Sequence, residues 1–152
     1  MKHNTFTTLD GSALKIGVVA ARFGQELTGA LLEDCLAALE FSGVPKGNIF
    51  EVRVSGSFEL PYAASALIAA HLDVDAVICL GIIIKGETRH DEYIAQAVSQ
   101  GLMRVSLDQK KPVLFGVLTT ENRDQAGVRV LGGHKKGWEA GLSAVEMALV
   151  KF

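Results

Sequence analysis

Cysteine is scarce in this chain, and its histidines do not form the close pairs of a metal site. The two cysteines, Cys35 and Cys79, stand inside apolar runs rather than in turns. This placement is typical of buried free thiols in a reducing compartment. The four histidines are scattered without paired ligand spacing; they are His3, His71, His90 and His134. The sequence therefore predicts no metal and no disulfide framework.

Long hydrophobic runs and a strong charge of one sign are missing too. The longest apolar run, residues 76–84, is too short to span a bilayer, and residues 1–12 are too polar for a signal peptide. The net charge of −2 gives no indication of nucleic-acid or membrane binding. We expect a cytoplasmic protein whose 152 residues form one domain. Residues 1–12 would be a flexible or subunit-docking N-terminal arm.

What the chain does have is an alternation of two hydrophobic periodicities. Short apolar runs rich in β-branched residues predict strands, and apolar stripes with i, i+4 spacing predict helices between them. The predicted strands are residues 15–21, 49–54, 76–84 and 113–118. The predicted helices are residues 25–41, 58–72 with a start near Ser57, a segment around 94–105, one from Asn122, and a last one burying Trp138, Leu142, Val145 and Leu149.

Strands that alternate with helices of this length form a parallel, doubly wound sheet. The predicted fold is α/β, a flavodoxin-like three-layer α/β/α sandwich with a four-stranded parallel sheet. In such sheets ligands bind beyond the carboxyl ends of the strands. The turns after the four strands are therefore the places to search for a site.

The turn after the third strand is the richest in chemistry. Thr88 and Asp91 have capping-box spacing, which predicts Thr88 as the N-cap and His90 in the first helical turn. Backbone amides at the positive end of this helix would suit a phosphate. The helix N-terminus favours a neutral imidazole, while Asp91 and Glu92 favour the imidazolium, so His90 is suited to exchanging protons. A polar loop with an exposed histidine is an equally supported interpretation.

Two nucleotide motifs fail at these turns. Gly81 and Gly86 have the spacing of a P-loop, but Glu87 stands where that motif needs lysine. The turn after the first strand carries Gly24 alone, whereas a dinucleotide fingerprint needs three spaced glycines. Both comparisons argue against a nucleotide substrate.

Aromatic and charged side chains near the other turns leave alternatives open. Phe23 and Phe58 follow different strands and are expected to face one crevice, where they would sandwich a planar heterocycle or belong to the core. Glu59 would hold ligand hydroxyls or stabilise a helix start. From spacing alone, Arg129 and the lysines at 135–136 are predicted to be solvated surface charge.

At these same turns the chain closely resembles the lumazine synthase family of riboflavin biosynthesis. The resemblance extends over about residues 16–148 and rests on several motifs in the right order. They are Gly-Ser-Phe-Glu-Leu-Pro at 56–61, Leu-Gly at 80–81, Lys-Gly-Glu-Thr with His90 at 85–90, Phe-Gly-Val-Leu-Thr-Thr-Glu-Asn at 115–122, Lys-Gly-Trp-Glu at 136–139 and Ser-Ala-Val-Glu-Met at 143–147.

The resemblance implies a transferase that condenses 5-amino-6-(D-ribitylamino)uracil with 3,4-dihydroxy-2-butanone 4-phosphate. The products are 6,7-dimethyl-8-ribityllumazine, phosphate and water, in the penultimate step of riboflavin biosynthesis and without any cofactor. By resemblance, His90 is catalytic and shuttles protons. The ribitylaminouracil would contact Phe23, Ser57, Phe58, Glu59, Ile82, Ile83, Ile84 and Phe115, and the butanone phosphate would contact Glu87, Thr88, Arg129 and Lys136.

The resemblance also implies a homo-oligomer with active sites shared between subunits. Phe115 and Arg129 would come from a neighbour in a pentamer, and sixty such subunits would form an icosahedral shell in some members. Association with riboflavin synthase is a further implied partnership.

Three positions depart from the usual pattern of the family. Gly24 replaces an asparagine, Ser55 replaces a proline, and the loop at 132–136 is about one residue shorter than in members that form shells. We therefore favour the pentamer and leave the shell open. The departures also keep open a non-catalytic ligand-binding or shell-forming protein on the same scaffold. A flavodoxin-type electron carrier is a weaker alternative, because the first turn lacks a Ser/Thr-rich phosphate loop.

Overall fold

The protein is built on a sheet of four parallel strands in the order β2-β1-β3-β4. The computed structural model describes residues 9–152, so most of the predicted N-terminal arm lies outside the described residues. The strands are β1 (Ile16–Ala21), β2 (Ile49–Val54), β3 (Ala76–Ile84) and β4 (Val113–Thr120). The predicted four-stranded parallel sheet is confirmed, with β4 two residues longer than expected.

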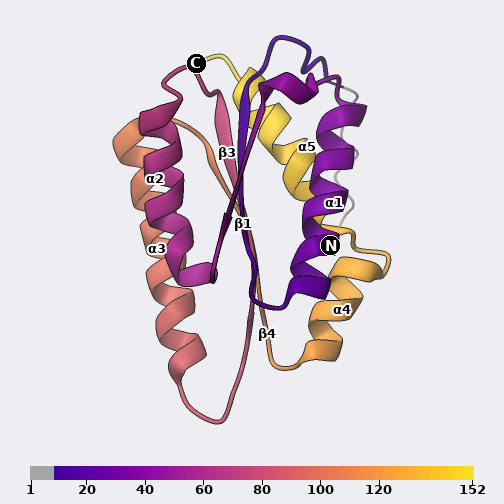
Figure 1. Cartoon of the computed structure of the whole chain (residues 1–152), viewed down its shortest axis with the longest axis vertical. Helices are drawn as coiled ribbons and strands as arrows, with labels where there is room; N and C mark the ends of the chain where they lie inside the picture. Colours follow the sequence, from indigo (N-terminus) through magenta and orange to yellow (C-terminus); the bar gives the residue numbers. More distant parts are fainter. Residues whose placement is uncertain (1–8) are drawn as a thin grey trace.

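Helices cover both faces of this sheet (Figure 1). One face carries α2 (Leu60–Ala70) and α3 (His90–Gln109). The other carries α1 (Gln25–Phe41), α4 (Arg123–Leu131) and α5 (Lys136–Leu149). Two short 3₁₀ turns complete the order, η1 (Lys46–Asn48) and η2 (Ser57–Glu59). This arrangement confirms the flavodoxin-like three-layer α/β/α sandwich, and η2 accounts for the predicted helix start near Ser57.

The two central strands supply the apolar core on both faces of the sheet. Side chains of β3 alternate, so Ile78 and Leu80 pack toward α1 and α5, while Val77 and Cys79 pack toward α2 and α3. Strand β1 alternates in the same way. When helices cover both faces of a strand, none of its side chains faces solvent, which explains the unbroken apolar run of β3.

The packing of α5 on α1 corrects one prediction. Of the four large residues predicted to be buried in the last helix, only Val145 is buried; Trp138 and Leu142 are half-buried and Leu149 is exposed. Small residues make the contact instead, since Gly137 and Gly141 let the backbones of α5 and α1 approach closely. Close approach leaves room for the large side chains only at the margins of the contact.

We expect Gly137→Ala to lower the free energy of unfolding by about 1–3 kcal/mol. A Cβ at this position would stand 2.9 Å from the carbonyl carbon of Leu31 and collide with its carbonyl oxygen, so the two helices would have to separate. Gly29→Ala on α1 is the matched control, because a Cβ there meets nothing within 4 Å. That control should be neutral or stabilising by up to about 1 kcal/mol. Urea unfolding at one protein concentration measures both, and equal stability of the two variants would contradict the prediction.

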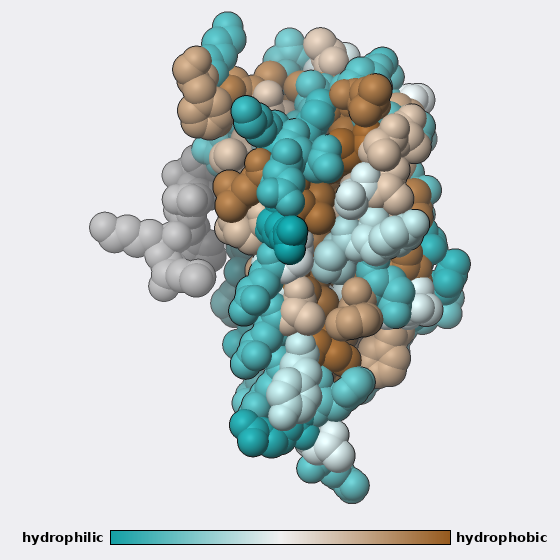
Figure 2. Space-filling view, turned by 90° about the vertical axis from the view of Figure 1, so that its left-hand side faces the viewer, coloured by the Kyte–Doolittle hydropathy of each residue, from teal (hydrophilic) through white to brown (hydrophobic). Residues whose placement is uncertain are grey.

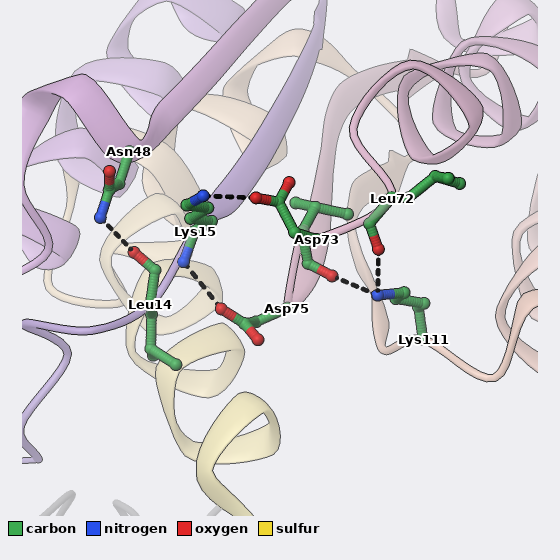
Figure 3. A network of polar contacts seen from close by, with 8 residues as sticks. Leu14, Lys15, Asn48, Leu72, Asp73, Asp75 and Lys111 are labelled. Carbon is green, nitrogen blue, oxygen red and sulfur yellow. Dashed lines mark hydrogen bonds and ion pairs between the residues drawn. The ribbon is translucent and has the colours of Figure 1, made fainter.

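Polar contacts tie the loops together at the amino-terminal edge of the sheet (Figure 3). The Lys15 backbone N–H donates to Asp75 Oδ2 at 2.8 Å, and Lys15 Nζ forms an ion pair with Asp73. The hydrogen bond from Lys15 holds the pKa of the Asp73 carboxyl below its ordinary value. Lys111 Nζ donates to the carbonyl oxygens of Leu72, at 2.9 Å, and Val74, at 2.7 Å. Structural polar residues therefore gather at this edge.

Both cysteines are buried in the core, as predicted. Burial raises the pKa of the Cys35 and Cys79 thiols to about 12 in each case. Because the thiolate is the reactive form, we expect neither thiol to react with a disulfide reagent near neutral pH until the protein unfolds. A thiol assay in buffer and in concentrated denaturant measures this, and prompt labelling of the native protein would contradict it.

Within residues 9–152, none of the helices is long and apolar enough to cross a membrane. The last residues of the predicted N-terminal arm are described, and they contact the body of the protein. The Gly11 backbone N–H donates to the carbonyl oxygen of Ser42 at 2.7 Å, just beyond α1.

Candidate active site

A cleft of about 520 Å³ opens at the carboxyl ends of β1, β2 and β3, the lower end of the molecule in Figure 1. It lies where the strand order reverses between β1 and β3, as ligand sites do in doubly wound sheets. The cleft is lined by Phe23, Ser55, Gly56, Ser57, Phe58, Glu59, Ile82, Ile83, Ile84, Gly86, Thr88, His90, Asp91 and Ile94.

The cleft brings together nine of the residues predicted for the site. They are Phe23, Ser57, Phe58, Glu59, Ile82, Ile83, Ile84, Thr88 and His90. These residues come from the turns after β1, β2 and β3 and from the carboxyl end of β3 itself, which the parallel order of the strands places side by side. Glu87 belongs to the same turn as Thr88 but does not line the cleft.

The turn after β1 presents an aromatic ring to the cleft. Hydrogen bonding to β2 continues past the strand, since the Phe23 backbone N–H donates to the carbonyl oxygen of Ser55 at 3.0 Å. Gly24 then begins α1 in the left-handed conformation, with φ at 69°. Glycine and asparagine are the residues that adopt this conformation most readily. The asparagine that the family resemblance leads us to expect at this position is therefore compatible with the backbone conformation that Gly24 adopts.

Phe23 and Phe58 face the cleft with most of their surface uncovered. Their side chains are 62% and 61% exposed, respectively. Exposed aromatic rings at the mouth of a cleft are suited to packing against a planar ligand. The structure thus removes the alternative that the two rings belong to the core.

The turn after β2 places a hydroxyl deep beside β3. Ser57 is only 6% exposed, and within the described residues its Oγ has no hydrogen-bond partner. A Cβ at position 81 would collide with that Oγ, so only glycine at position 81 allows Ser57 to sit this close to the strand. The side chain of Glu59 approaches Gly56 on the same turn and lines the cleft.

The turn after β3 corrects the predicted helix cap. Helix α3 begins at His90 with Arg89 as its N-cap, and no side chain caps it. Thr88 Oγ1 instead accepts a hydrogen bond from the backbone N–H of His90 at 3.4 Å. The hydroxyl bonds two residues ahead, as threonine does in turns, rather than three ahead as in a capping box. The exposed His90 side chain still lies at the positive end of α3, beside the cleft.

Exposed ion pairs surround the cleft without entering it. Arg89 Nε lies 3.2 Å from Glu92 Oε2. Lys85 Nζ, directly after β3, lies 3.5 Å from Glu121 Oε2, directly after β4. Such solvated pairs contribute little to stability. Arg89 and Glu92 do not line the cleft, so His90 and Asp91 are the titratable groups that α3 presents to it.

Three predicted site residues lie away from the cleft within one chain. Phe115 is on β4 and 53% exposed. Arg129 is exposed on α4, and its Nη1 donates to the carbonyl oxygen of Gln125 at 3.0 Å. Lys136 Nζ, at the start of α5, pairs with Glu139 Oε2 at 2.9 Å. One chain therefore does not bring these residues to the cleft.

Five cleft residues were absent from the predicted site: Ser55, Gly56 and Gly86 in the turns, and Asp91 and Ile94 on α3. Asp91 and Ile94 line the cleft together with His90. Their positions, one and four residues beyond His90, lie on one face of a helix, so helical spacing was a usable signal. Across residues 9–152, no three His, Cys, Asp or Glu side chains gather closely enough to hold a metal ion.

The fold and the cleft define a class: an α/β protein with a small-molecule site at the carboxyl edge of a doubly wound sheet. The chain belongs to the 6,7-dimethyl-8-ribityllumazine synthase family, whose model matches residues 13–151. It is 47% identical over 137 residues to the 6,7-dimethyl-8-ribityllumazine synthase of Cytophaga hutchinsonii, covering 90% of this chain and 86% of that protein.

Two further relatives carry the same name. The protein of Aquifex aeolicus is 45% identical over 141 residues, which cover 92% of this chain and 91% of the relative. The protein of Methylibium petroleiphilum is 45% identical over 144 residues, which cover 95% and 88%. The chain is accordingly an enzyme, a transferase of lumazine synthesis in riboflavin biosynthesis, and it acts on small molecules.

Proposed function

We propose that this cleft condenses 5-amino-6-(D-ribitylamino)uracil with 3,4-dihydroxy-2-butanone 4-phosphate to give 6,7-dimethyl-8-ribityllumazine. This is the penultimate step of riboflavin biosynthesis. The observation that carries the proposal is the convergence in one cleft of two uncovered aromatic rings, Phe23 and Phe58, with His90 at a helix N-terminus. This condensation needs three things from the protein: a surface that binds a planar heterocycle, a group that transfers protons, and a site for an anion.

The reaction joins two substrates through steps that move protons. The 5-amino group adds to the ketone, and loss of water gives an imine. Elimination of phosphate follows, and closure by the ribityl-bearing nitrogen with loss of a second water completes the ring. Addition, elimination and dehydration each require a proton donor or acceptor, and His90 is the cleft's imidazole. Holding both substrates in one geometry supplies much of the remaining acceleration.

The cleft residues divide between the two substrates. Phe23 and Phe58 stack on the pyrimidine, while Ile82, Ile83 and Ile84 line its edge. Ser57 and Glu59 hold polar atoms of the ring and the ribityl chain. The phosphate lies at the amides around Glu87 and Thr88, at the positive end of α3. No cofactor or metal takes part in this mechanism.

The remaining groups for the phosphorylated substrate come from a second copy of the chain. Phe115, Arg129 and Lys136 are predicted site residues that lie away from the cleft of their own chain. We propose a homopentamer in which a neighbour delivers them, with the sixty-subunit shell as the larger alternative.

The face built by α2 and α3 carries uncovered apolar side chains among polar ones (Figure 2), including Tyr62, Leu72, Tyr93, Met103 and Leu107. Native mass measurement distinguishes a pentamer from a shell or a monomer.

Within the same proposal, the chain acts as one cytoplasmic domain. The assembled enzyme would also associate with riboflavin synthase, which consumes its product. Co-sedimentation of the two purified proteins tests that partnership.

Mixing the purified protein with both substrates and following lumazine absorbance tests the reaction. We expect product formation well above the spontaneous rate. Folded protein that binds the ribitylaminouracil tightly but gives no product above background would favour the non-catalytic alternative. A yellow protein with bound flavin mononucleotide would favour the electron carrier.

A further inference from the structure

Asp91 stands out in the cleft because its hydrogen-bonding capacity is unused. It lines the cleft beside His90 and Ile94, on the face of α3 that looks toward η2. Its Oδ1 is shielded from solvent, and no described residue donates a hydrogen bond to it. A shielded carboxylate oxygen without a donor is unfavourable. The side chain is therefore poised for a donor that the described chain does not supply.

The neighbouring acid shows that this is not a general property of the helix start. Glu92 is also in the first turn of α3, yet its side chain is 48% exposed and pairs with Arg89 at 3.2 Å. Both acids interact favourably with the helix dipole. Of the two acids, only Asp91 lines the cleft and has a shielded oxygen without a hydrogen-bond partner among the described residues. Stabilisation of the helix start therefore does not explain its position.

The chemistry of the cleft limits what the donor is. Ile94, Phe58 and Ile83 are among the apolar and aromatic residues that line the cleft with Asp91, and its other polar side chains are those of Ser55, Ser57, Glu59, Thr88 and His90. A carboxylate among them attracts N–H and O–H groups and repels phosphate. Rotation about the Cβ–Cγ bond, which is soft in aspartate, can turn either oxygen toward the cleft.

We propose that Asp91 is a substrate-binding, specificity-determining residue that accepts a hydrogen bond from an N–H or O–H of the ribitylaminouracil. This inference rests on the proposed function and deepens it. Of the two proposed substrates, the ribitylaminouracil is the one rich in N–H donors and carries no phosphate. Asp91 thus separates the two substrates within the cleft: it binds the pyrimidine substrate and keeps the phosphate on the side of Thr88.

Steady-state kinetics of Asp91→Asn and Asp91→Ala test the inference, with Glu92→Gln as the matched control. Asp91→Asn keeps the size of the side chain and removes one charge, as Glu92→Gln does in the same helical turn. We expect Asp91→Asn to raise the KM for the ribitylaminouracil about tenfold, because the acceptor loses its charge and the hydrogen bond weakens. Asp91→Ala should raise it at least as much, and Glu92→Gln should not change it. The KM for the butanone phosphate should stay constant or fall in both Asp91 variants.

Calorimetric titration with the ribitylaminouracil alone, and circular dichroism of each variant, complete the test. If the wild-type enzyme forms lumazine, and Asp91→Asn and Glu92→Gln have equal KM values for the ribitylaminouracil, the inference is overturned and the proposed function stands. A change confined to the KM of the butanone phosphate would also overturn it, since Asp91 would then act only by repelling phosphate. Wild-type protein that neither binds the ribitylaminouracil nor forms lumazine would remove the proposed function and this inference together.

Discussion

Replacing His90 with alanine is expected to lower kcat about 100-fold or more while leaving thermal unfolding unchanged. Proton transfer by a positioned imidazole is worth about 10²–10⁴ in rate. The side chain of His90 is exposed, and its described hydrogen bond is made by the backbone N–H, so its removal opens no cavity. Initial rates of lumazine formation, corrected for the spontaneous reaction, measure the first effect, and a melting curve measures the second.

His71→Ala is the control for this variant. His71 follows α2 at the opposite edge of the sheet, where its ring stacks on Phe50 with centroids 3.9 Å apart and an interplanar angle of 12°. Loss of that stack should lower the melting temperature without lowering kcat. His90→Ala should therefore lower kcat without changing stability, and His71→Ala should lower stability without changing kcat. A His90→Ala enzyme as fast as the wild type would exclude His90 as the proton-transfer group.

Arg129→Ala should raise the KM for the butanone phosphate at least about tenfold and change the KM for the ribitylaminouracil little. A guanidinium paired with a phosphate contributes about 1.5–3 kcal/mol, which is a factor of about 10 to 150 in affinity. Among residues 9–152, the Arg129 side chain donates a hydrogen bond only to the carbonyl oxygen of Gln125, so its removal should not unfold α4. Substrate saturation curves for each substrate in turn measure the effect.

Arg123→Ala is the matched control, because Arg123 is on the same helix and makes an exposed ion pair with Glu26 at 2.7 Å. It should leave both KM values unchanged.

Mixing His90→Ala with Arg129→Ala chains and reassembling them tests whether the site is shared. A site that takes His90 from one chain and Arg129 from its neighbour regains both groups in some positions, so activity should exceed that of either variant alone. Mixtures no more active than the separate variants would place both groups in the cleft of one chain.

Most of the fold could be predicted from the sequence because it depends on local patterns. The apolar run of β3 and the i, i+4 stripe of α1 fix element type through side-chain periodicity. The alternation of these elements then leaves few arrangements other than a parallel sheet covered on both faces. The predictions failed where packing decides. Leu149 continues an apolar stripe yet is exposed, since α5 approaches α1 through Gly137 and Gly141.

The candidate site was predictable to the extent that it follows strand ends. Phe23, Phe58 and His90 lie in or at the end of the segments that follow three strands, and parallel strands bring such segments to one edge. The cap of α3 was wrong by one residue because a threonine hydroxyl can bond two or three residues ahead with little difference in energy. Asp91 was missed as a cleft residue because a side chain's unused hydrogen bond is visible only when its surroundings are known.

The sequence by itself determined the order of strands and helices, the parallel sheet and the turns that carry the chemistry. These follow from hydrophobic periodicity and from a few short motifs, which are properties of neighbours along the chain. Only the tertiary structure decided which side chains share one cleft, that Gly81 makes room for Ser57, and that Arg129 and Phe115 lie outside. Those facts depend on distances between segments far apart in sequence, which periodicity does not encode.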